Sequence, residues 1–79
     1  MRLDKYLKVS RLIKRRSVAN DACDNERVTV NGREAKAGYQ VKPGDIIEIA
    51  FGSRRLRVEV ITVTENAAKA DAAAMYREV

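Results

Sequence analysis

The sequence predicts an α+β fold in which two short N-terminal helices pack on a small antiparallel sheet and a C-terminal helix follows. Three observations support this fold class. Apolar residues recur at helical spacing near both ends of the chain, they alternate with polar residues in the middle, and turn-forming residues separate the alternating stretches. The 79 residues contain no internal repeat and no Gly/Ser-rich linker, so we expect one domain over residues 1–79.

The first helix is predicted at the start of the chain. Leu3, Tyr6 and Leu7 share one face at spacings of three and four residues, while basic residues occupy the other sides. We expect residues 10–14 to connect this helix to the next one, with the two apolar residues of the connection held in the core.

A second helix is predicted over residues 16–24, because apolar positions again recur at helical spacing. Its expected buried residues are Val18, Ala19, Ala22 and Cys23. Asn25 tolerates the left-handed conformation and is expected to end the helix. Three cations at positions 14–16 precede the first turn, where free N–H groups and the helix dipole favour an anion.

Alternating residues after this helix predict an antiparallel sheet. The predicted strands are residues 28–30, 33–36, 46–51 and 56–63. Asn31-Gly32 is typical of a tight hairpin turn. Residues 42–45 place Pro43 where a turn needs a fixed φ and Gly44 where it needs a positive φ. Gly52-Ser53 reverses the chain between the last two strands.

The composition becomes rich in alanine from Asn66 onward, which favours a final helix docked on the rest of the fold. Its apolar stripe consists of Ala68, Ala72, Met75, Tyr76 and Val79.

The positive charge of the chain is concentrated at one end. The formal net charge is +5. Residues 1–16 contain seven basic residues and one acid, a net charge of +6, whereas residues 17–79 carry −1. Such an asymmetry is typical of a surface that binds a polyanion, since a merely solvated surface mixes the two signs.

The composition excludes several classes of enzyme. Cys23 is the one cysteine and there is no histidine, so a Cys/His zinc site, a Cys-His dyad and a Ser-His-Asp triad all lack their parts. A single cysteine suits a reducing cytoplasm. No apolar run is long enough to span a membrane or to serve as a signal peptide. We therefore expect a cytoplasmic protein that has no metal, no cofactor and no membrane partner.

Five blocks resemble, in order and spacing, the RNA-binding domain named after ribosomal protein S-four, also called the alpha-L motif. They are RLDKYL from Arg2, RLIKRRSVA from Arg11, RVTVNG from Arg27, AK at Ala35-Lys36 and VKPGDIIEI from Val41. The resemblance covers about residues 2–50, and the extra strand and C-terminal helix are expected at about residues 55–79. The chain is most similar to the stand-alone bacterial members of the RqcP type, which are related to a small ribosome-binding heat-shock protein.

This resemblance implies a non-enzymatic factor of ribosome-associated quality control. Such a factor binds a stalled large ribosomal subunit that still holds peptidyl-tRNA, contacts rRNA and tRNA, and assists RqcH in adding a C-terminal tail to the nascent chain. We expect the protein to act as a monomer.

The candidate RNA-binding residues follow from motif position, with Arg2 and Arg16 first. The complete set is Arg2, Lys5, Lys8, Arg11, Lys14, Arg15, Arg16, Asn31 and Lys36. The chain departs from the family at two positions. Glu26 stands where the family commonly has glycine, and Arg15 stands where many members cap the second helix with Thr or Ser.

Four other residues have a structural interpretation. Asp4 suits the dipole of the first helix or orients a neighbouring arginine. Tyr6 and Cys23 are expected in the core, Cys23 as a small apolar residue. Tyr39 is expected to pack on the fold, with stacking on an exposed base as the alternative.

Two other functions remain open at this stage. The chain could be the RNA-targeting module of an RNA-modifying enzyme such as a pseudouridine synthase, although no catalytic carboxylate constellation follows residue 63. It could also be a protein-interaction module that uses the apolar stripe around Met75 and Tyr76.

Overall fold

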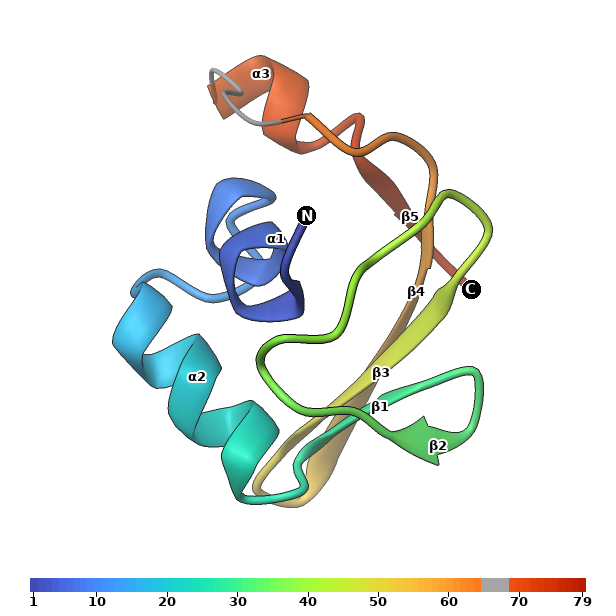
Figure 1. Ribbon diagram of the computed structural model, residues 1–79. Coiled ribbons are helices and arrows are strands. Elements are labelled where there is room, and N and C mark those ends of the chain that lie inside the picture. The colour runs from blue at the N-terminus through green and yellow to red at the C-terminus, as the bar shows by residue number, and fades with distance from the viewer. Residues whose placement is uncertain (65–68) are drawn as a thin grey trace.

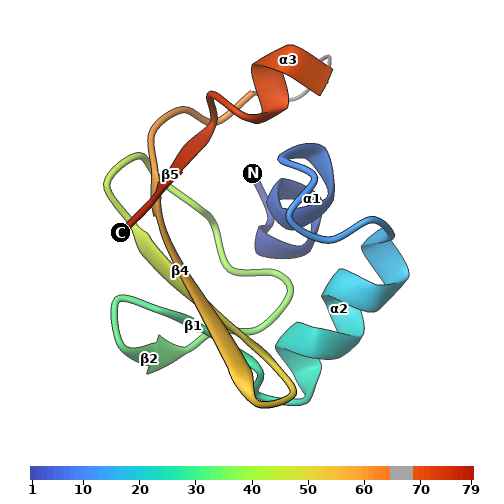
Figure 2. The same cartoon turned by 180° about the vertical axis from the view of Figure 1, so that it is seen from behind.

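In the computed structural model, which describes residues 1–64 and 69–79, two helices lie on one face of a five-stranded antiparallel sheet (Figure 1). The helices are α1 (Leu3–Val9), α2 (Arg16–Asp24) and the short α3 (Lys69–Ala72). The strands are β1 (Val28–Val30), β2 (Arg33–Glu34), β3 (Ile46–Phe51), β4 (Arg54–Val60) and β5 (Tyr76–Glu78). Their order in the sheet is β2-β1-β3-β4-β5, and the view from behind in Figure 2 shows α1 and α2 on the same side of it. The predicted α+β class and the two N-terminal helices are confirmed.

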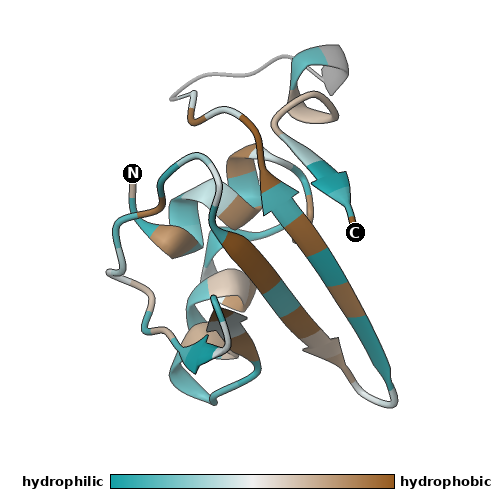
Figure 3. Ribbon diagram, turned by 90° about the vertical axis from the view of Figure 1, so that its right-hand side faces the viewer, coloured by the Kyte–Doolittle hydropathy of each residue, from teal (hydrophilic) through white to brown (hydrophobic). Residues whose placement is uncertain are grey.

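The core fills the space between α1, α2 and the inner face of the sheet. Alternating residues of β3 and β4 point inward, as the alternating colours along these strands in Figure 3 illustrate. Its largest fully buried side chains include Tyr6, Leu3, Leu7, Ile47, Ile49, Met75, Val28, Val58 and Val60. The Tyr6 hydroxyl donates a 2.8 Å hydrogen bond to the Met75 carbonyl oxygen and so ties α1 to the segment before β5.

The start of α1 is held by the segment that follows β2. The Leu3 amide donates to the Tyr39 carbonyl at 2.8 Å, and the Asp4 amide donates to the Ala37 carbonyl at 3.2 Å. Arg2 forms an isolated antiparallel bridge with Gln40. These bonds use first-turn N–H groups that a helix otherwise leaves unpaired, and they fix the backbone at Arg2.

The end of α2 differs from the sequence expectation. Asn25 has a φ of −95°, and it is Glu26 that takes the left-handed conformation, with a φ of 62°. The Glu26 amide bonds to the Cys23 carbonyl at 3.2 Å and the Arg27 amide to the Ala22 carbonyl at 2.9 Å, the pattern of a Schellman motif. In a Schellman motif the left-handed residue follows the C-cap directly and is usually glycine. In this chain Glu26 occupies that position.

The predicted C-terminal helix is wrong beyond Ala72. Helix α3 has four residues, and residues 76–78 form β5, which pairs with β4. Pairing satisfies the edge of β4, and the Arg77 guanidinium adds an ion pair to Glu59 at 2.8 Å, so long-range contacts override the helix propensity of the alanine-rich segment. The predicted stripe residue Ala68 lies outside the described residues.

The stripe is nevertheless partly buried, since Ala72 and Met75 are each 1% exposed. Tyr76 is half-buried. Met75 itself is therefore not available as an interaction surface, whereas Val79 of the same stripe is 52% exposed.

Two smaller expectations about burial and strand ends also need correction. Val18 is 51% exposed instead of buried, because it lies at the margin of the core, over an open groove between α2 and the β3–β4 hairpin. The last predicted strand, residues 56–63, is shifted, since β4 covers Arg54–Val60 and its first residue already pairs with Phe51 across the Gly52-Ser53 turn.

Among the described residues, no helix is both long and apolar enough to cross a membrane.

Candidate nucleic-acid interface

The seven basic candidates of the N-terminal segment lie at the N-cap of α1, on α1, on the connection that follows it and at the start of α2 (Figure 1). Lys5 is half-buried, and the side chains exposed to solvent are Arg2, Lys8, Arg11, Lys14, Arg15 and Arg16. We call these seven residues the basic patch. Lys36 is exposed and directly precedes the segment that holds the start of α1, whereas Asn31 lies in the turn between β1 and β2.

Asp4 joins two members of the basic patch, Arg2 and Arg16. Its carboxylate is 2% exposed and accepts hydrogen bonds from side chains of both helices. Arg2 Nε donates to Oδ1 at 3.2 Å, and Arg16 Nε donates to Oδ2 at 3.4 Å. Asn20 Nδ2 also donates to Oδ2, at 3.3 Å. The expectation that Asp4 orients a neighbouring arginine is confirmed, and the contact extends to Arg16, twelve residues away.

Electrostatics keep this buried carboxylate ionised. Burial by itself raises the pKa of Asp4, but hydrogen bonds from Asn20, from the Lys5 amide at 2.8 Å and from Arg16 outweigh burial. The pKa of Asp4 therefore lies below its ordinary value of 3.8. An ionised Asp4 holds two guanidinium groups side by side, and both arginine side chains remain 49% exposed and able to meet a ligand.

Asn20 is a contributor that the sequence reasoning missed. It lies four residues after Arg16 on α2, so the two side chains share one face of the helix. The sequence signal that could have indicated its role is an asparagine four residues after Arg16, on a helix that follows one with an acid, Asp4, in its first turn.

The start of α2 has no side-chain cap. Arg15 occupies the N-cap position with extended backbone angles, φ −123° and ψ 137°, and its side chain makes no capping hydrogen bond. Because a helix N-terminus carries partial positive charge, the three cations at positions 14–16 and the first turn of α2 combine into one electropositive region.

Asn31 is committed to the fold through both ends of its amide. Its Oδ1 accepts from the Ile46 amide at 2.9 Å, and its Nδ2 donates to Asp45 Oδ1 at 3.1 Å. The Tyr39 hydroxyl donates to the other Asp45 oxygen at 3.0 Å. Burial and this contact with Asp45 raise the pKa of Tyr39. The geometry favours a structural role for both side chains, as expected for Tyr39.

Cys23 has the environment of a structural residue. It is 1% exposed, and burial, with smaller contributions from Asp4 and Asp24, raises the pKa of its thiol to about 11. The thiol is therefore protonated at neutral pH and unsuited to nucleophilic chemistry. The expectation of a small buried apolar residue is confirmed.

Comparison with known proteins agrees with this geometry. The model of the S4 domain family matches residues 1–47. The chain belongs to the S4 domain family. This S4 domain chain is 53% identical over 76 residues to a protein of Halalkalibacterium halodurans named "RQC P-site tRNA stabilizing factor", a match covering 96% of the chain and 86% of that relative. A Bacillus subtilis protein of the same name is 49% identical over 96% of the chain and 88% of its own length.

A solved structure has the same fold. The Heat Shock Protein 15 of Vibrio cholerae, described as trimeric, superposes with a TM-score of 0.92 at 29% identity over all of this S4 domain chain and 81% of its own. The similarity of the fold extends beyond the 1–47 match and includes the part of the chain that contains β5.

Arg11 combines an unfavourable backbone conformation with a place in the basic patch. It has a φ of 64°, and its amide bonds to the Lys8 carbonyl at 3.1 Å just past the end of α1. The left-handed region costs a residue other than glycine about 1–2 kcal/mol. A strained residue that persists at a candidate site is a reason to test it for function.

Replacing Arg11 with glycine is expected to stabilise this S4 domain protein and to weaken RNA binding. Relief of backbone strain exceeds the entropic cost of glycine, so the free energy of unfolding should rise by about 0.5–1 kcal/mol. Loss of one cation should lower RNA affinity roughly fivefold to tenfold. Chemical denaturation and fluorescence anisotropy with a structured RNA measure the two effects.

Glu26→Gly is the matched control, because Glu26 has the same strained conformation at the end of α2. It should give a similar gain in stability and no loss of RNA affinity. An Arg11→Gly protein that binds RNA as tightly as the parent would remove Arg11 from the candidate interface.

Proposed function

We propose that this protein is a non-enzymatic RNA-binding factor of ribosome-associated quality control, acting in the cytoplasm on a large ribosomal subunit that still holds peptidyl-tRNA. The observation that carries the proposal is the 49–53% identity, over 96% of the chain, to proteins named "RQC P-site tRNA stabilizing factor". The S4 domain match and the basic patch support the RNA-binding part.

The geometry supplies a mechanism for this role. Arg2 and Arg16, held by Asp4, present two guanidinium groups in a fixed relation, and a guanidinium can bind two phosphate oxygens at once. The remaining cations of the basic patch and the uncapped start of α2 add attraction for neighbouring phosphates. Such a surface reads the shape and backbone of folded RNA, which is how double-stranded RNA is mostly recognised.

We further propose that residues 1–79 act as one domain and as a monomer, with rRNA of the large subunit and peptidyl-tRNA as direct partners. Cooperation with RqcH in tailing the nascent chain is part of the same proposal. The protein would contribute binding and positioning to that process, with no covalent step of its own.

Co-sedimentation tests the proposal. The protein is mixed with free large subunits that carry peptidyl-tRNA, with the same subunits after release of the peptidyl-tRNA, and with intact ribosomes. We expect the strongest binding to the first preparation and a steep loss of binding as salt rises. Equal binding to intact ribosomes would contradict the quality-control role, and binding that is independent of salt would contradict recognition through phosphates.

A further inference from the structure

The tip of the β3–β4 hairpin exposes an aromatic ring beside an arginine. Phe51 is 44% exposed. It is the cross-strand partner of Arg54 in the register of the hairpin, so the two side chains leave the same face of the sheet. An exposed aromatic residue next to a guanidinium is the combination on which unstacked nucleobases bind.

The same hairpin carries more positive charge than its acids neutralise. Arg55 and Arg57 share a single carboxylate, that of Glu48, at 3.1 and 3.3 Å. Within residues 1–64 and 69–79, Arg54 has no carboxylate in ion-pair distance, and neither does Arg27. The register places Arg55 and Arg57, with Glu48, on the face of the hairpin opposite to Phe51, so the cations on the side of Phe51 are Arg54 and Arg27.

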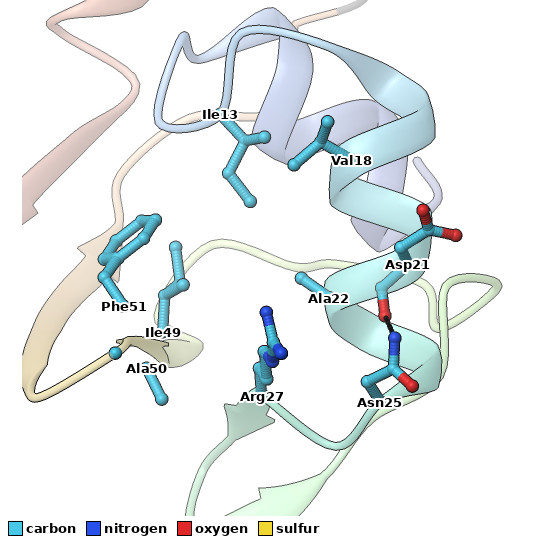
Figure 4. Close-up of a pocket in the computed structure, with 10 residues that line it drawn as sticks. Ile13, Val18, Asp21, Ala22, Asn25, Arg27, Ile49, Ala50 and Phe51 are labelled. Atoms are coloured by element: carbon cyan, nitrogen blue, oxygen red, sulfur yellow. Dashed lines mark hydrogen bonds between the residues drawn. The ribbon is translucent and has the colours of Figure 1, made fainter.

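An open groove of about 530 Å³ lies between this hairpin and α2. Figure 4 shows Phe51 and Ile49 on the hairpin side, Val18 on the helix side, and the guanidinium of Arg27 pointing up between the walls. Asn25 lines the groove on the helix side, and its Nδ2 donates to the Asp21 carbonyl at 2.8 Å. The groove thus combines apolar walls, a cation that can stack on a ring and polar groups that can meet the edge of a base.

We propose that this groove and the hairpin tip form a second RNA contact that takes one unstacked nucleobase, with Phe51 and Arg27 against the ring and Arg54 on the adjoining phosphate. Arg27 in the groove and Arg54 beside Phe51 outnumber the one carboxylate of the described groove lining, that of Asp21, and this excess of cations favours RNA over a protein partner. The groove begins at Ile13 and Val18, beside the start of α2, and runs to Asn25 at the far end of that helix, so it adjoins the basic patch and extends the charged surface toward the hairpin. The inference rests on the proposed function only in taking RNA as the partner.

Two synthetic RNA stem-loops test the proposal, one fully paired in its stem and one with a single bulged nucleotide. Phe51→Leu keeps an apolar side chain and removes the ring, so we expect a roughly tenfold loss of affinity for the bulged RNA and no change for the paired one. Ile61→Leu is the matched control, because Ile61 is 42% exposed just beyond the end of β4, away from the hairpin tip, and it should change neither affinity. Thermal unfolding confirms that both variants are folded.

A second pair of variants tests the phosphate contact. Arg54→Gln should lower affinity for the bulged RNA and reduce its salt dependence by about one unit of slope, whereas Arg77→Gln, which removes an arginine paired with Glu59, should not. Unchanged affinities in Phe51→Leu and Arg54→Gln, or equal losses on both RNAs, would overturn the second contact. If the protein still co-sediments with large subunits while neither variant loses affinity selectively for the bulged RNA, the groove proposal is wrong and the proposed function stands. If the variants do lose affinity selectively but the protein does not bind large subunits, the ribosomal role is wrong and the groove proposal stands.

Discussion

Removal of both Arg2 and Arg16 side chains by alanine substitution is expected to lower affinity for a structured RNA about 100-fold. A hydrogen bond to a charged group is worth about 1.5 kcal/mol at the lower end of its range, so the loss of two phosphate contacts costs about 3 kcal/mol, a factor of roughly 100 in affinity. The slope of log affinity against log salt should flatten by about two units, since each lost phosphate contact releases about one counterion fewer. Fluorescence anisotropy over a salt series measures both quantities.

Arg33→Ala with Arg77→Ala is the matched control, because it removes the same charge from two exposed arginines at opposite edges of the sheet. That protein should lose only the small, long-range part of the attraction. If the two double variants bind RNA equally well, net charge rather than the Asp4-anchored pair determines affinity, and the proposed interface is wrong.

Elements with local signals could be predicted from the sequence. Both N-terminal helices follow from apolar spacing, and the bounds of α2 agree with the prediction. The hairpin at Asn31-Gly32 has the expected positive φ values, 55° and 82°, and Gly44 has a φ of 92° as its turn requires. In each case the residues that determine the conformation lie within a few positions of one another.

Elements determined by distant partners could not be predicted in this way. Strand β5 forms because β4 offers an unpaired edge, with Val60 opposite Tyr76. The alanine-rich composition of the segment favours a helix and carries no information about that distant edge. Val18 has the helical spacing of a buried residue, yet it is 51% exposed because an open groove separates that part of α2 from the β3–β4 hairpin.

The candidate site was predictable in location but not in organisation. Charge clustering places it in residues 1–16, and the structure brings Arg2 and Arg16 together there. The buried contact of Asp4 with Asn20 depends on how α1 packs against α2, which spacing alone does not supply. The arginines of the β3–β4 hairpin do not show in the net charge of residues 17–79, because acids elsewhere in that part of the sequence cancel their charge.

Replacing Asp4 with asparagine is expected to weaken RNA binding about tenfold even though it adds one unit of positive charge. The carboxylate accepts from Arg2, Arg16, Asn20 and the Lys5 amide, whereas an amide has one acceptor oxygen and would turn its own N–H groups toward these donors. The two guanidinium groups would then lose their fixed relation. Asp24→Asn makes the same charge change at an exposed position and should leave affinity equal or slightly higher. Tighter binding in both variants would show that Asp4 does not position the arginines.

The pH dependence of stability separates this positioning role from a general loss of folding. Because the pKa of Asp4 in the folded protein is lowered, the ionised carboxylate contributes stability that is complete above its ordinary, unfolded pKa of 3.8 and is lost as the pH decreases through the lower folded pKa. Asp4→Asn should therefore be less stable by about 2 kcal/mol at neutral pH, and its free energy of unfolding should decline less steeply below pH ~4 than that of the parent. Parallel acid profiles would contradict an ionised Asp4 as the anchor, since only a carboxylate that is held charged by Asn20, the Lys5 amide and Arg16 gives the parent its additional acid sensitivity.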